Sequence, residues 1–534
     1  MVRILVSDKL AAEGLEILQS AQDVEVNVKT GLKPEELCSI IGEYDGLIIR
    51  SDTKVTADVL SHAHRLRVIA RAGVGVDNVD VPAATRKGIV VMNTPDGNTI
   101  STAEQTMCLL LALARHTVNA CASLRAGKWD RSVYMGRQLF GKTLGVVGLG
   151  RVGQAVAERA LGFGMQVLGY DPYFASPQGS LKGRIEMIDD INELCRRCDY
   201  LTVHTPKTAQ TTGLIGKDQF ALMKKGAAVI NCARGGIINE EALYEALTSG
   251  KLSGAGLDVY TKEPPEDRRL VELPNVVCTP HLGASTLEAQ VLVAADAARQ
   301  LVTFLKTGEV INAVNAPGYS SSLAKALRPY ASLAQRMARI LSQISPGRTK
   351  KLKIAYQGEI ADMETGVVTT SALVGMLQGR TEQPVNAVNA QLLARDRGIE
   401  VEETSSSTAG DFTTLIQMDL ETDKGVRGVS GTVFSGTLPR IVGICDYRME
   451  MVPEGRILIT YNDDKPGVIG SVGALFGRHN INIGSLTFGR KRETEKSVMV
   501  FALDAEPSKE VMDELSALPF IDAVHYIQLP DLET

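Results

Sequence analysis

The sequence predicts an α/β protein with two parallel-sheet units, followed by an α+β segment and a small tail. Short apolar runs alternate with helical stretches from residue 1 to about 98, and the same alternation resumes from about 101 to 282. Such alternation indicates doubly wound parallel sheets, the second with about six or seven strands. Residues 455–534 read strand, helix, strand, strand, helix, strand, which is the ferredoxin-like order βαββαβ.

Length and composition support a chain of several compact domains. The 534 residues predict about three to four domains. Apolar residues make up 44% and charged residues 22%, with a net charge of −5 and both signs mixed, which excludes an electrostatic footprint for nucleic acid or an anionic membrane. The start VRILVSD resembles a strand and has no basic leader. We therefore expect a cytoplasmic protein, or one of an organelle stroma if a leader has been removed.

The most informative stretch runs from Lys142 to Asp171. It predicts a strand at 143–147, a glycine turn, a helix from about 152 to 163, and a second strand at 166–170. The turn has the GxGxxG spacing of a dinucleotide-binding βαβ unit, a Rossmann-like fold. The residues of this turn that are expected to contact the cofactor are Gly148, Gly150 and Gly153.

Each residue of this turn has a physical reason. The first glycine permits the tight turn, the second lets backbone N–H groups approach a pyrophosphate, and the third lets the helix pack on the strand. Asp171 ends the second strand, 18 residues after Gly153. A carboxylate there accepts hydrogen bonds from the ribose hydroxyls and repels a 2′-phosphate, so NAD is predicted rather than NADP.

The first unit lacks this glycine pattern and is predicted to hold a substrate. Arg50 and Ser51 follow one apolar strand and Arg71 to Gly75 follow another, at carboxyl ends where ligands collect in open α/β sheets. Either arginine alone is more often a solvated surface charge. The predicted boundaries are 1–98 for the first unit (completed by 284–317), 99–283 for the nucleotide unit, 318–452 for the third unit and 455–534 for the tail.

The third unit offers little chemistry. It begins with a helical stretch, continues with a basic strand-like piece and then has shorter strands and turns. VNAVNAQ at Val385 echoes VINAVNAP at Val310, although one short echo does not establish a repeat. The eight cysteines are scattered, as expected for reduced thiols. Cys195 and Cys198 have CxxC spacing, but no second pair completes a metal site, so no metal is predicted.

Three residues at strand ends of the nucleotide unit suggest chemistry: Arg234, Glu263 and His281. An enzyme that moves a hydride from carbon to nicotinamide must also move the hydroxyl proton, and histidine is suited to that near neutral pH. A carboxylate can orient the ring, and an arginine fork can hold a substrate carboxylate. A lone histidine usually packs, but here all three follow one dinucleotide motif.

Several motifs together resemble a known family. They are GLGRVG at 148–153 with Asp171, HTP at 204–206, NCARGG at 231–236, GLDVYTKEPP at 256–265 and TPHLGAST at 279–286. These resemble the NAD-dependent D-2-hydroxyacid dehydrogenases. RAGVGVDNVD at 71–80, NTPDGNTISTAEQ at 93–105 and GKWDR at 127–131 narrow the resemblance to the D-3-phosphoglycerate dehydrogenases. In their long form, an intervening domain matches 318–452 and an ACT domain matches the tail.

The resemblance implies oxidation of D-3-phosphoglycerate to 3-phosphooxypyruvate, the first step of the phosphorylated route to L-serine. It implies that Arg234 binds the substrate carboxylate, and that His281 exchanges the proton with support from Glu263. The residues that would surround the NAD are Gly148, Gly150, Arg151, Val152, Gly153, Asp171, Thr205, Cys232, Ala233, Arg234, Asp258, His281 and Gly283.

The resemblance also implies how the substrate and a second subunit are held. Val74 and Gly75 would offer backbone N–H groups to the substrate carboxylate, although relatives often have threonine at Val74. Arg50, with Ser51 beside it, and Arg131 are candidates for the substrate phosphate, Arg131 from a second subunit. A homodimer or homotetramer is expected.

In the tail, Asn462, Asp464 and Asn482 match positions where related ACT domains bind L-serine, and all three are expected in loops. Relatives often have histidine at Asn462, and a tail that only assembles subunits is the alternative. Two other functions stay open: a dehydrogenase of another D-2-hydroxy acid, and a dinucleotide-sensing corepressor. Full retention of Arg234, Glu263 and His281 disfavours the corepressor.

Overall fold

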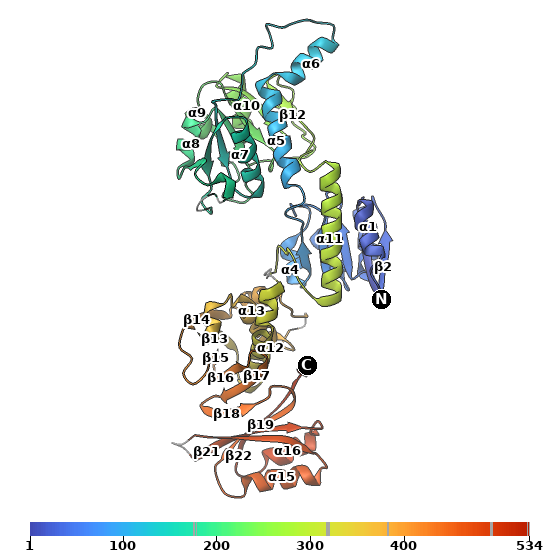
Figure 1. Ribbon diagram of the computed structural model, residues 1–534. Helices are drawn as coiled ribbons and strands as arrows, with labels where there is room; N and C mark the ends of the chain where they lie inside the picture. The colour runs from blue at the N-terminus through green and yellow to red at the C-terminus, as the bar shows by residue number, and fades with distance from the viewer. Residues whose placement is uncertain are drawn as a thin grey trace.

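The computed structural model describes residues 1–534 apart from 175–176, 178, 317–320, 382–383, 492–494, 531 and 533–534. Its four sheets lie one after another along an elongated molecule (Figure 1). The nucleotide unit lies at one end and the C-terminal unit at the other. The N-terminal unit lies between the nucleotide unit and the third unit, so the order in space differs from the order along the chain.

The N-terminal unit is a five-stranded parallel sheet in the order β2-β1-β3-β4-β5. Alternate residues of β1 point to opposite faces: Ile4 and Val6 pack with α11, whereas Leu5 packs with α2 to α4. Burial on both faces explains the continuous apolar runs. The elements are β1 (Val2–Val6), α1 (Ala12–Gln19), β2 (Val24–Val28), α2 (Pro34–Ile40), β3 (Gly46–Ile49), α3 (Ala57–His62), β4 (Val68–Arg71), α4 (Val81–Arg86) and β5 (Val90–Met92).

The long helix α11 (Leu287–Thr307) comes from beyond the second sheet and packs on the first. Val293, Ala297 and Leu301 are buried in the same cluster as residues of β1. Thr286 caps its N-terminus by accepting a hydrogen bond from the Ala289 N–H. Residues far apart in sequence therefore share one core.

The nucleotide unit is a seven-stranded parallel sheet in the order β12-β11-β10-β9-β6-β7-β8, which confirms the predicted strand number. The strand order reverses between β6 and β9, the switch point where such sheets bind ligands. Helices α5 and α7 cover one face and α8 to α10 the other. The elements are α5 (Thr99–Ala114), α6 (Thr117–Arg125), β6 (Thr143–Val147), α7 (Arg151–Gly162), β7 (Gln166–Tyr170), β8 (Ile185–Met187), α8 (Ile191–Arg197), β9 (Tyr200–Val203), α9 (Lys217–Leu222), β10 (Ala227–Asn231), α10 (Glu240–Thr248), β11 (Leu252–Leu257) and β12 (Val276–Cys278).

The third unit is a mixed six-stranded sheet in the order β14-β13-β15-β16-β17-β18. Its amphipathic helix α12 packs against α13 and against β15, β16 and β17. The basic strand-like piece is β13, with 10 residues, and the strands β14, β15, β17 and β18 are shorter, as predicted, whereas β16 also has 10 residues. The elements are α12 (Ser321–Ile344), β13 (Thr349–Gly358), α13 (Gly366–Leu377), α14 (Ala390–Asp396), β14 (Glu400–Ser406), β15 (Thr414–Thr422), β16 (Gly425–Phe434), β17 (Leu438–Ile444) and β18 (Tyr447–Met451).

The C-terminal unit is a four-stranded antiparallel sheet in the order β20-β21-β19-β22, with α15 and α16 on one face. The predicted order βαββαβ is confirmed. The elements are β19 (Gly455–Asp463), α15 (Val468–Arg478), β20 (Ile483–Arg490), β21 (Lys496–Leu503), α16 (Lys509–Ser516) and β22 (Ile521–Leu529).

Within the described part of the chain, no single helix is long and apolar enough to cross a membrane. The helices α5 and α6, bent by 63° relative to each other, are together long and apolar enough to cross one, by length and composition only. Helix α5 buries Ala103, Leu110 and Leu113 against the nucleotide sheet, which accounts for its apolar sequence.

Candidate active site

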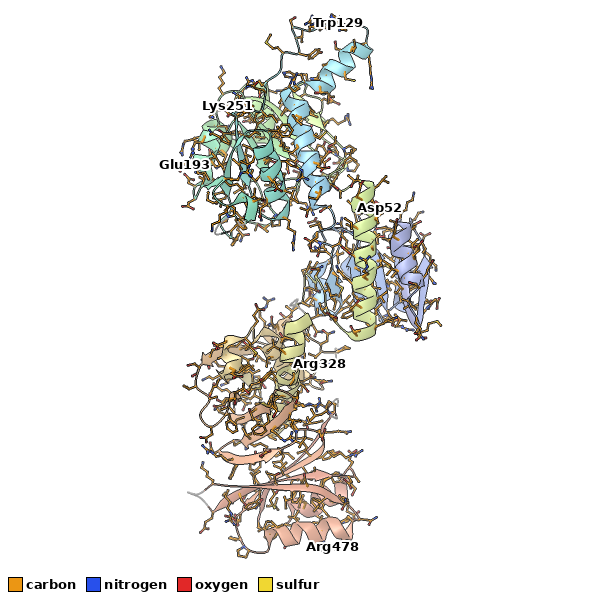
Figure 2. All side chains as sticks on the ribbon, viewed as in Figure 1. Asp52, Trp129, Glu193, Lys251, Arg328 and Arg478 are labelled. Carbon is orange, nitrogen blue, oxygen red and sulfur yellow. The ribbon has the colours of Figure 1, made fainter. Side chains whose placement is uncertain are left out.

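The predicted site residues come from the carboxyl ends of parallel strands in two facing units. In the nucleotide unit, Arg234 follows β10, Glu263 follows β11 and His281 follows β12. In the N-terminal unit, Arg50 follows β3 and Arg71 ends β4. The two units meet here, because the Arg234 Nε lies 3.0 Å from the Asp77 Oδ2. Figure 2 shows the N-terminal unit, marked by Asp52, next to the nucleotide unit.

His281 and Glu263 form the predicted pair, with 2.7 Å between His281 Nδ1 and Glu263 Oε2. The other carboxylate oxygen, Oε1, accepts a hydrogen bond from the Tyr260 N–H at 3.1 Å. Burial raises the pKa of Glu263, but the hydrogen bonds from His281 and Tyr260 outweigh it, so this pKa lies below its ordinary value. An ionised carboxylate only accepts hydrogen bonds, so the proton lies on Nδ1 and Nε2 is left free to accept one.

The nearby His204 is unsuited to proton transfer. Burial lowers its pKa to about 3, and its Nε2 lies 3.0 Å from the Thr202 hydroxyl. His281 is 47% exposed at the side chain and can exchange protons with a bound molecule.

Asp258 holds the loop that carries His281. Its Oδ1 accepts hydrogen bonds from the Thr279 hydroxyl at 2.6 Å and the Leu282 N–H at 2.7 Å. Its Oδ2 accepts from the Gly283 N–H at 2.7 Å. Asp258 has no exposed surface. Both carboxylate oxygens accept hydrogen bonds from the loop, so Asp258 positions His281.

Arg234 reaches across to the N-terminal unit. Its guanidinium lies so close to Gly75 that a Cβ added there would overlap with Nη2. Its Nη1 donates to the Ala233 carbonyl at 2.7 Å, which fixes the side chain. Glycine at position 75 therefore permits the close approach of the loop to the guanidinium.

Arg71 was missed as a site residue by the sequence reasoning, although its motif was noted. Burial, with Arg234 and Arg50 nearby, lowers its pKa to about 10. Its Nε is buried without a hydrogen-bond partner among the described residues, and so is the Nε of Arg50. Arg50, Arg71 and Arg234 thus concentrate positive charge at these strand ends, which suits a ligand with several negative charges. The motif RAGVG ending a strand was the available signal.

The glycine turn has room for a dinucleotide. Gly148 has a φ of 92°, and a Cβ there would lie 2.7 Å from the His204 carbonyl oxygen. At Gly150, the N-cap of α7, no described atom lies within 4 Å of the position a Cβ would take. Packing does not require glycine at 150, so the open space at the helix N-terminus fits a pyrophosphate.

Other predicted cofactor residues border the same turn. The Asp171 carboxylate accepts from the Leu149 N–H at 2.9 Å and from the Tyr173 N–H at 3.0 Å. The Thr205 hydroxyl is buried and has no partner among the described residues, so a ligand could satisfy it. Arg151 pairs with Asp96 at 2.5 Å. Burial raises the pKa of the Cys232 thiol to about 12, which keeps it neutral. Val152 and Gly153 lie in the first turn of α7, and Ala233 follows β10.

Arg131 does not join the site within one chain. It lies in the exposed loop after α6, two residues beyond Trp129. Figure 2 shows Trp129 at the end of the molecule, far from Asp52 in the N-terminal unit. Ser51, by contrast, is exposed directly beside Arg50.

The three predicted effector residues lie in different surroundings. Asp464 lines a cavity of about 390 Å³ with Pro466, Gly467 and Phe488, and pairs with Arg490 at 3.0 Å. The prediction that Asn462 lies in a loop was wrong: it belongs to β19 and is 1% exposed. Its amide donates to the Ser497 hydroxyl at 2.8 Å. Asn482 is exposed and donates to Asp504 at 2.6 Å.

Comparisons with known proteins agree with this geometry. The family model "D-isomer specific 2-hydroxyacid dehydrogenase, NAD binding domain" matches residues 107–283. The nucleotide unit is therefore the NAD-binding domain of a dehydrogenase of that class. The model "D-3-phosphoglycerate dehydrogenase intervening domain" matches 326–445, and the ACT domain model matches 456–520.

Full-length relatives define the family more narrowly. The chain is 44% identical over 529 residues to the D-3-phosphoglycerate dehydrogenase of Methanocaldococcus jannaschii, covering 99% of this chain and 100% of that protein. It is 39% identical over 530 residues to the enzyme of that name from Bacillus subtilis, covering 99% and 100%. This chain belongs to the D-3-phosphoglycerate dehydrogenase family.

Solved structures resemble the first part of the chain. The structure of the TT0316 protein from Thermus thermophilus is 39% identical, with a TM-score of 0.54, and covers 59% of this chain and 100% of its own. A structure of D-2-hydroxyisocaproate dehydrogenase is 29% identical, with a TM-score of 0.52, and covers 59% and 99%.

Proposed function

We propose that this protein oxidises D-3-phosphoglycerate to 3-phosphooxypyruvate with NAD. The observation that carries the proposal is the His281–Glu263 pair, which lies at the same strand ends as Arg234. The phosphate and carboxylate of this substrate match the positive charge of Arg50, Arg71 and Arg234. Full-length similarity to enzymes of that name supports the choice of substrate.

In the proposed reaction, the Arg234 fork and the Val74 and Gly75 N–H groups hold the substrate carboxylate. His281 Nε2 takes the proton of the hydroxyl group, while Nδ1 keeps its hydrogen bond to Glu263. NAD, when bound, accepts the hydride from the carbon that carries this hydroxyl group. The imidazolium that forms is stabilised by the ionised Glu263 carboxylate next to it.

We assign the substrate phosphate to Arg50 and Ser51, with Arg71 behind them and Arg131 supplied by a second subunit. The face that would form the dimer carries exposed Trp129, Val133, Met135 and Phe140 beyond α6, near Phe163 of α7. Exposed apolar side chains gathered in one stretch of the chain are candidates for an association site. Sedimentation equilibrium tests the assembly, because a monomer at micromolar concentration would contradict it.

The runner-up is a dehydrogenase of another D-2-hydroxy acid, such as D-glycerate. The two functions differ in the need for the phosphate-binding arginines. Steady-state NAD reduction with D-3-phosphoglycerate and with D-glycerate separates them, and we expect kcat/KM for the phosphorylated substrate to be at least about a hundredfold higher, the effect of roughly two charged hydrogen bonds.

The variant His281→Ala tests the proposed role of His281. We expect it to lower kcat with D-3-phosphoglycerate by about 10²- to 10⁴-fold, the usual contribution of a positioned acid–base group, with little change in NAD affinity. Activity within tenfold of the parent would contradict the role of His281. Equal kcat/KM for the two substrates would contradict the substrate assignment.

A further inference from the structure

The pentapeptide NAVNA occurs twice, at 312–316 and 386–390, and both copies contact the same turn. The first lies in the segment after α11 and the second in the intervening domain, before α14. The turn comprises residues 85–91, from the last residues of α4 to the first residues of β5 in the N-terminal unit. The two copies, taken together, are called the clasp below.

The first copy extends the N-terminal sheet at its edge. Met92 of β5 pairs with Ala313 in an antiparallel bridge, and the Val314 N–H donates to the Val91 carbonyl at 2.8 Å. The Asn315 side chain accepts from the Val91 N–H at 2.8 Å and donates to the Ile89 carbonyl at 2.8 Å. These bonds satisfy backbone groups that the edge strand β5 would otherwise expose.

The second copy holds the same turn from the intervening domain. The Asn386 amide donates to the Gly88 carbonyl at 2.8 Å, and the buried Asn389 amide donates to the Arg86 carbonyl at 3.5 Å. Val388 lies between them, is 8% exposed and belongs to the hydrophobic cluster of Val90. The intervening domain thus adds one side chain to the core of the N-terminal unit.

Around the second copy the contact between these two units is hollow. A cavity of about 550 Å³ lies beside the clasp and is lined by Thr85, Asn315, Leu373, Val388 and Arg395, among others. Tight contacts are therefore concentrated at the asparagines and Val388, and few side chains decide whether the two units stay together.

The far end of β5 leads directly to the predicted substrate loop. The Asn93 amide donates to the Val74 carbonyl at 2.6 Å, and the Thr94 N–H donates to the Gly73 carbonyl at 3.0 Å. Only Met92 of β5 separates the clasped turn from Asn93. Movement of the turn along the strand direction would therefore displace the loop.

We propose that the clasp docks the intervening domain on the N-terminal unit and thereby holds the loop of Val74 and Gly75 in its substrate-binding position. The effect on substrate binding rests on the proposed function of that loop, whereas the docking does not. A loop that is not held must be ordered when the substrate binds, and this cost lowers the affinity.

Gly88→Ala tests the clasp with a matched control. Gly88 has a φ of 73°, and a Cβ there would lie 2.5 Å from the Asn386 amide nitrogen. Gly31, in the same unit, also has a φ of 73°, but no described atom lies within 4 Å of its Cβ position. Gly31→Ala therefore carries the same backbone strain without disturbing the clasp.

We expect Gly88→Ala to raise KM for D-3-phosphoglycerate about fivefold or more, with kcat and KM for NAD within twofold of the parent. Its radius of gyration, measured by small-angle X-ray scattering, should exceed that of the parent and of Gly31→Ala. If the two glycine variants have equal radii, the docking role is overturned. If only Gly88→Ala has a larger radius but the two glycine variants have the same KM for D-3-phosphoglycerate, the effect on the loop is overturned.

Asn386→Asp provides a second variant that keeps local structure. Its carboxylate can still accept from the Val388 and Asn389 N–H groups, as the Asn386 oxygen does, but it cannot donate to Gly88. The radius of gyration of Asn386→Asp should increase as that of Gly88→Ala does. The double variant should have no larger radius and no higher KM for D-3-phosphoglycerate than either single variant. Additive effects would overturn a shared contact. Scattering needs no turnover, so failure of the proposed reaction leaves the docking test intact.

Discussion

At the residue scale, the chemistry depends on how neighbours fix three polar side chains. Glu263 orients the His281 ring, Asp258 holds its loop, and Ala233 receives a hydrogen bond from Arg234. Each fixing contact comes from a backbone group or from a carboxylate that is itself hydrogen-bonded to the backbone, so little ordering is needed when a substrate arrives. This is the preorganisation that makes electrostatic stabilisation effective.

The lowered pKa of Glu263 predicts how its contribution to stability depends on pH. An unfolded glutamate titrates at about pH 4.3, so the stabilisation is complete above that value and is lost as the pH falls through the lower folded pKa. Because the pair is partly exposed, we expect the isosteric Glu263→Gln to lower the thermal midpoint by only about 1–3 °C at pH 7. Differential scanning calorimetry from pH 8 down to about pH 3 measures this difference, which should shrink below about pH 4.3. A difference that is constant with pH would contradict an ionised Glu263.

The residue roles could be predicted where a motif states both the residue type and its strand end. His281 and Glu263 were found in this way, and they lie within hydrogen-bond distance. The loop-holding contacts of Asp258 and the burial of Arg71 could not be predicted, because they depend on side-chain direction and on the facing unit. Asn462 was misplaced because a polar residue near a strand end does not reveal its burial.

At the element scale, Asp171 has two roles at the turn between β6 and α7, one structural and one in the proposed binding of NAD. Its carboxylate accepts the Leu149 N–H inside the glycine turn, which fixes the turn to the end of β7. In the proposed function it also accepts the ribose hydroxyls. The strand bounds 143–147 and 166–170 agree with the sequence prediction, because glycine spacing and apolar runs specify this unit locally.

Asp171→Ala should weaken NAD binding and narrow the preference for NAD over NADP, because it removes the ribose acceptor and the repulsion of a 2′-phosphate. Asp171→Asn is the matched control, since its amide oxygen can still accept the Leu149 N–H while the charge is lost. We expect at least about a tenfold weaker NAD affinity for Asp171→Ala, by roughly one charged hydrogen bond. Isothermal titration with both dinucleotides measures this. A parent protein that prefers NADP would contradict the assignment.

The third unit shows where element prediction fails. Strands shorter than the basic piece β13 were expected after it, yet β16 has 10 residues, as many as β13, and pairs with β15 in antiparallel order. Asp419 and Arg427 interrupt the apolar pattern, and glycines at 425, 428 and 431 look like turns. Pairing with neighbouring strands overrides these local preferences, which no single segment reveals.

At the scale of the whole molecule, the ACT domain lies at the end opposite the NAD-binding domain (Figure 1). Arg336 of α12 binds both chain ends of the ACT domain, because the Arg336 Nη1 donates to the Pro453 carbonyl at 3.0 Å and to the Pro530 carbonyl. Pro453 precedes β19 and Pro530 follows β22. Arg336 therefore connects both ends of the ACT domain to the intervening domain.

The proposed effector site follows from this arrangement. Asp464 lines the cavity of about 390 Å³ at the end of β19, and its ion pair with Arg490 leaves its second oxygen available for the ammonium group of an amino acid. We propose that L-serine binds there, between two ACT domains, with Asn482 from the second copy. Inhibition requires unequal affinity for the active and restrained states, with a coupling of about 1–3 kcal/mol.

Asp464→Ala should abolish inhibition by L-serine and leave uninhibited turnover intact, since the ACT domain supplies none of the proposed catalytic groups. Arg490→Ala is the control, because it breaks the same ion pair but keeps the carboxylate. We expect Arg490→Ala to remain inhibited, with the half-inhibiting concentration changed by less than about tenfold, as for one exposed ion pair. Turnover measured against serine concentration for the three proteins decides the matter. A flat response up to millimolar serine in the parent would mean that the ACT domain binds another ligand or only assembles subunits.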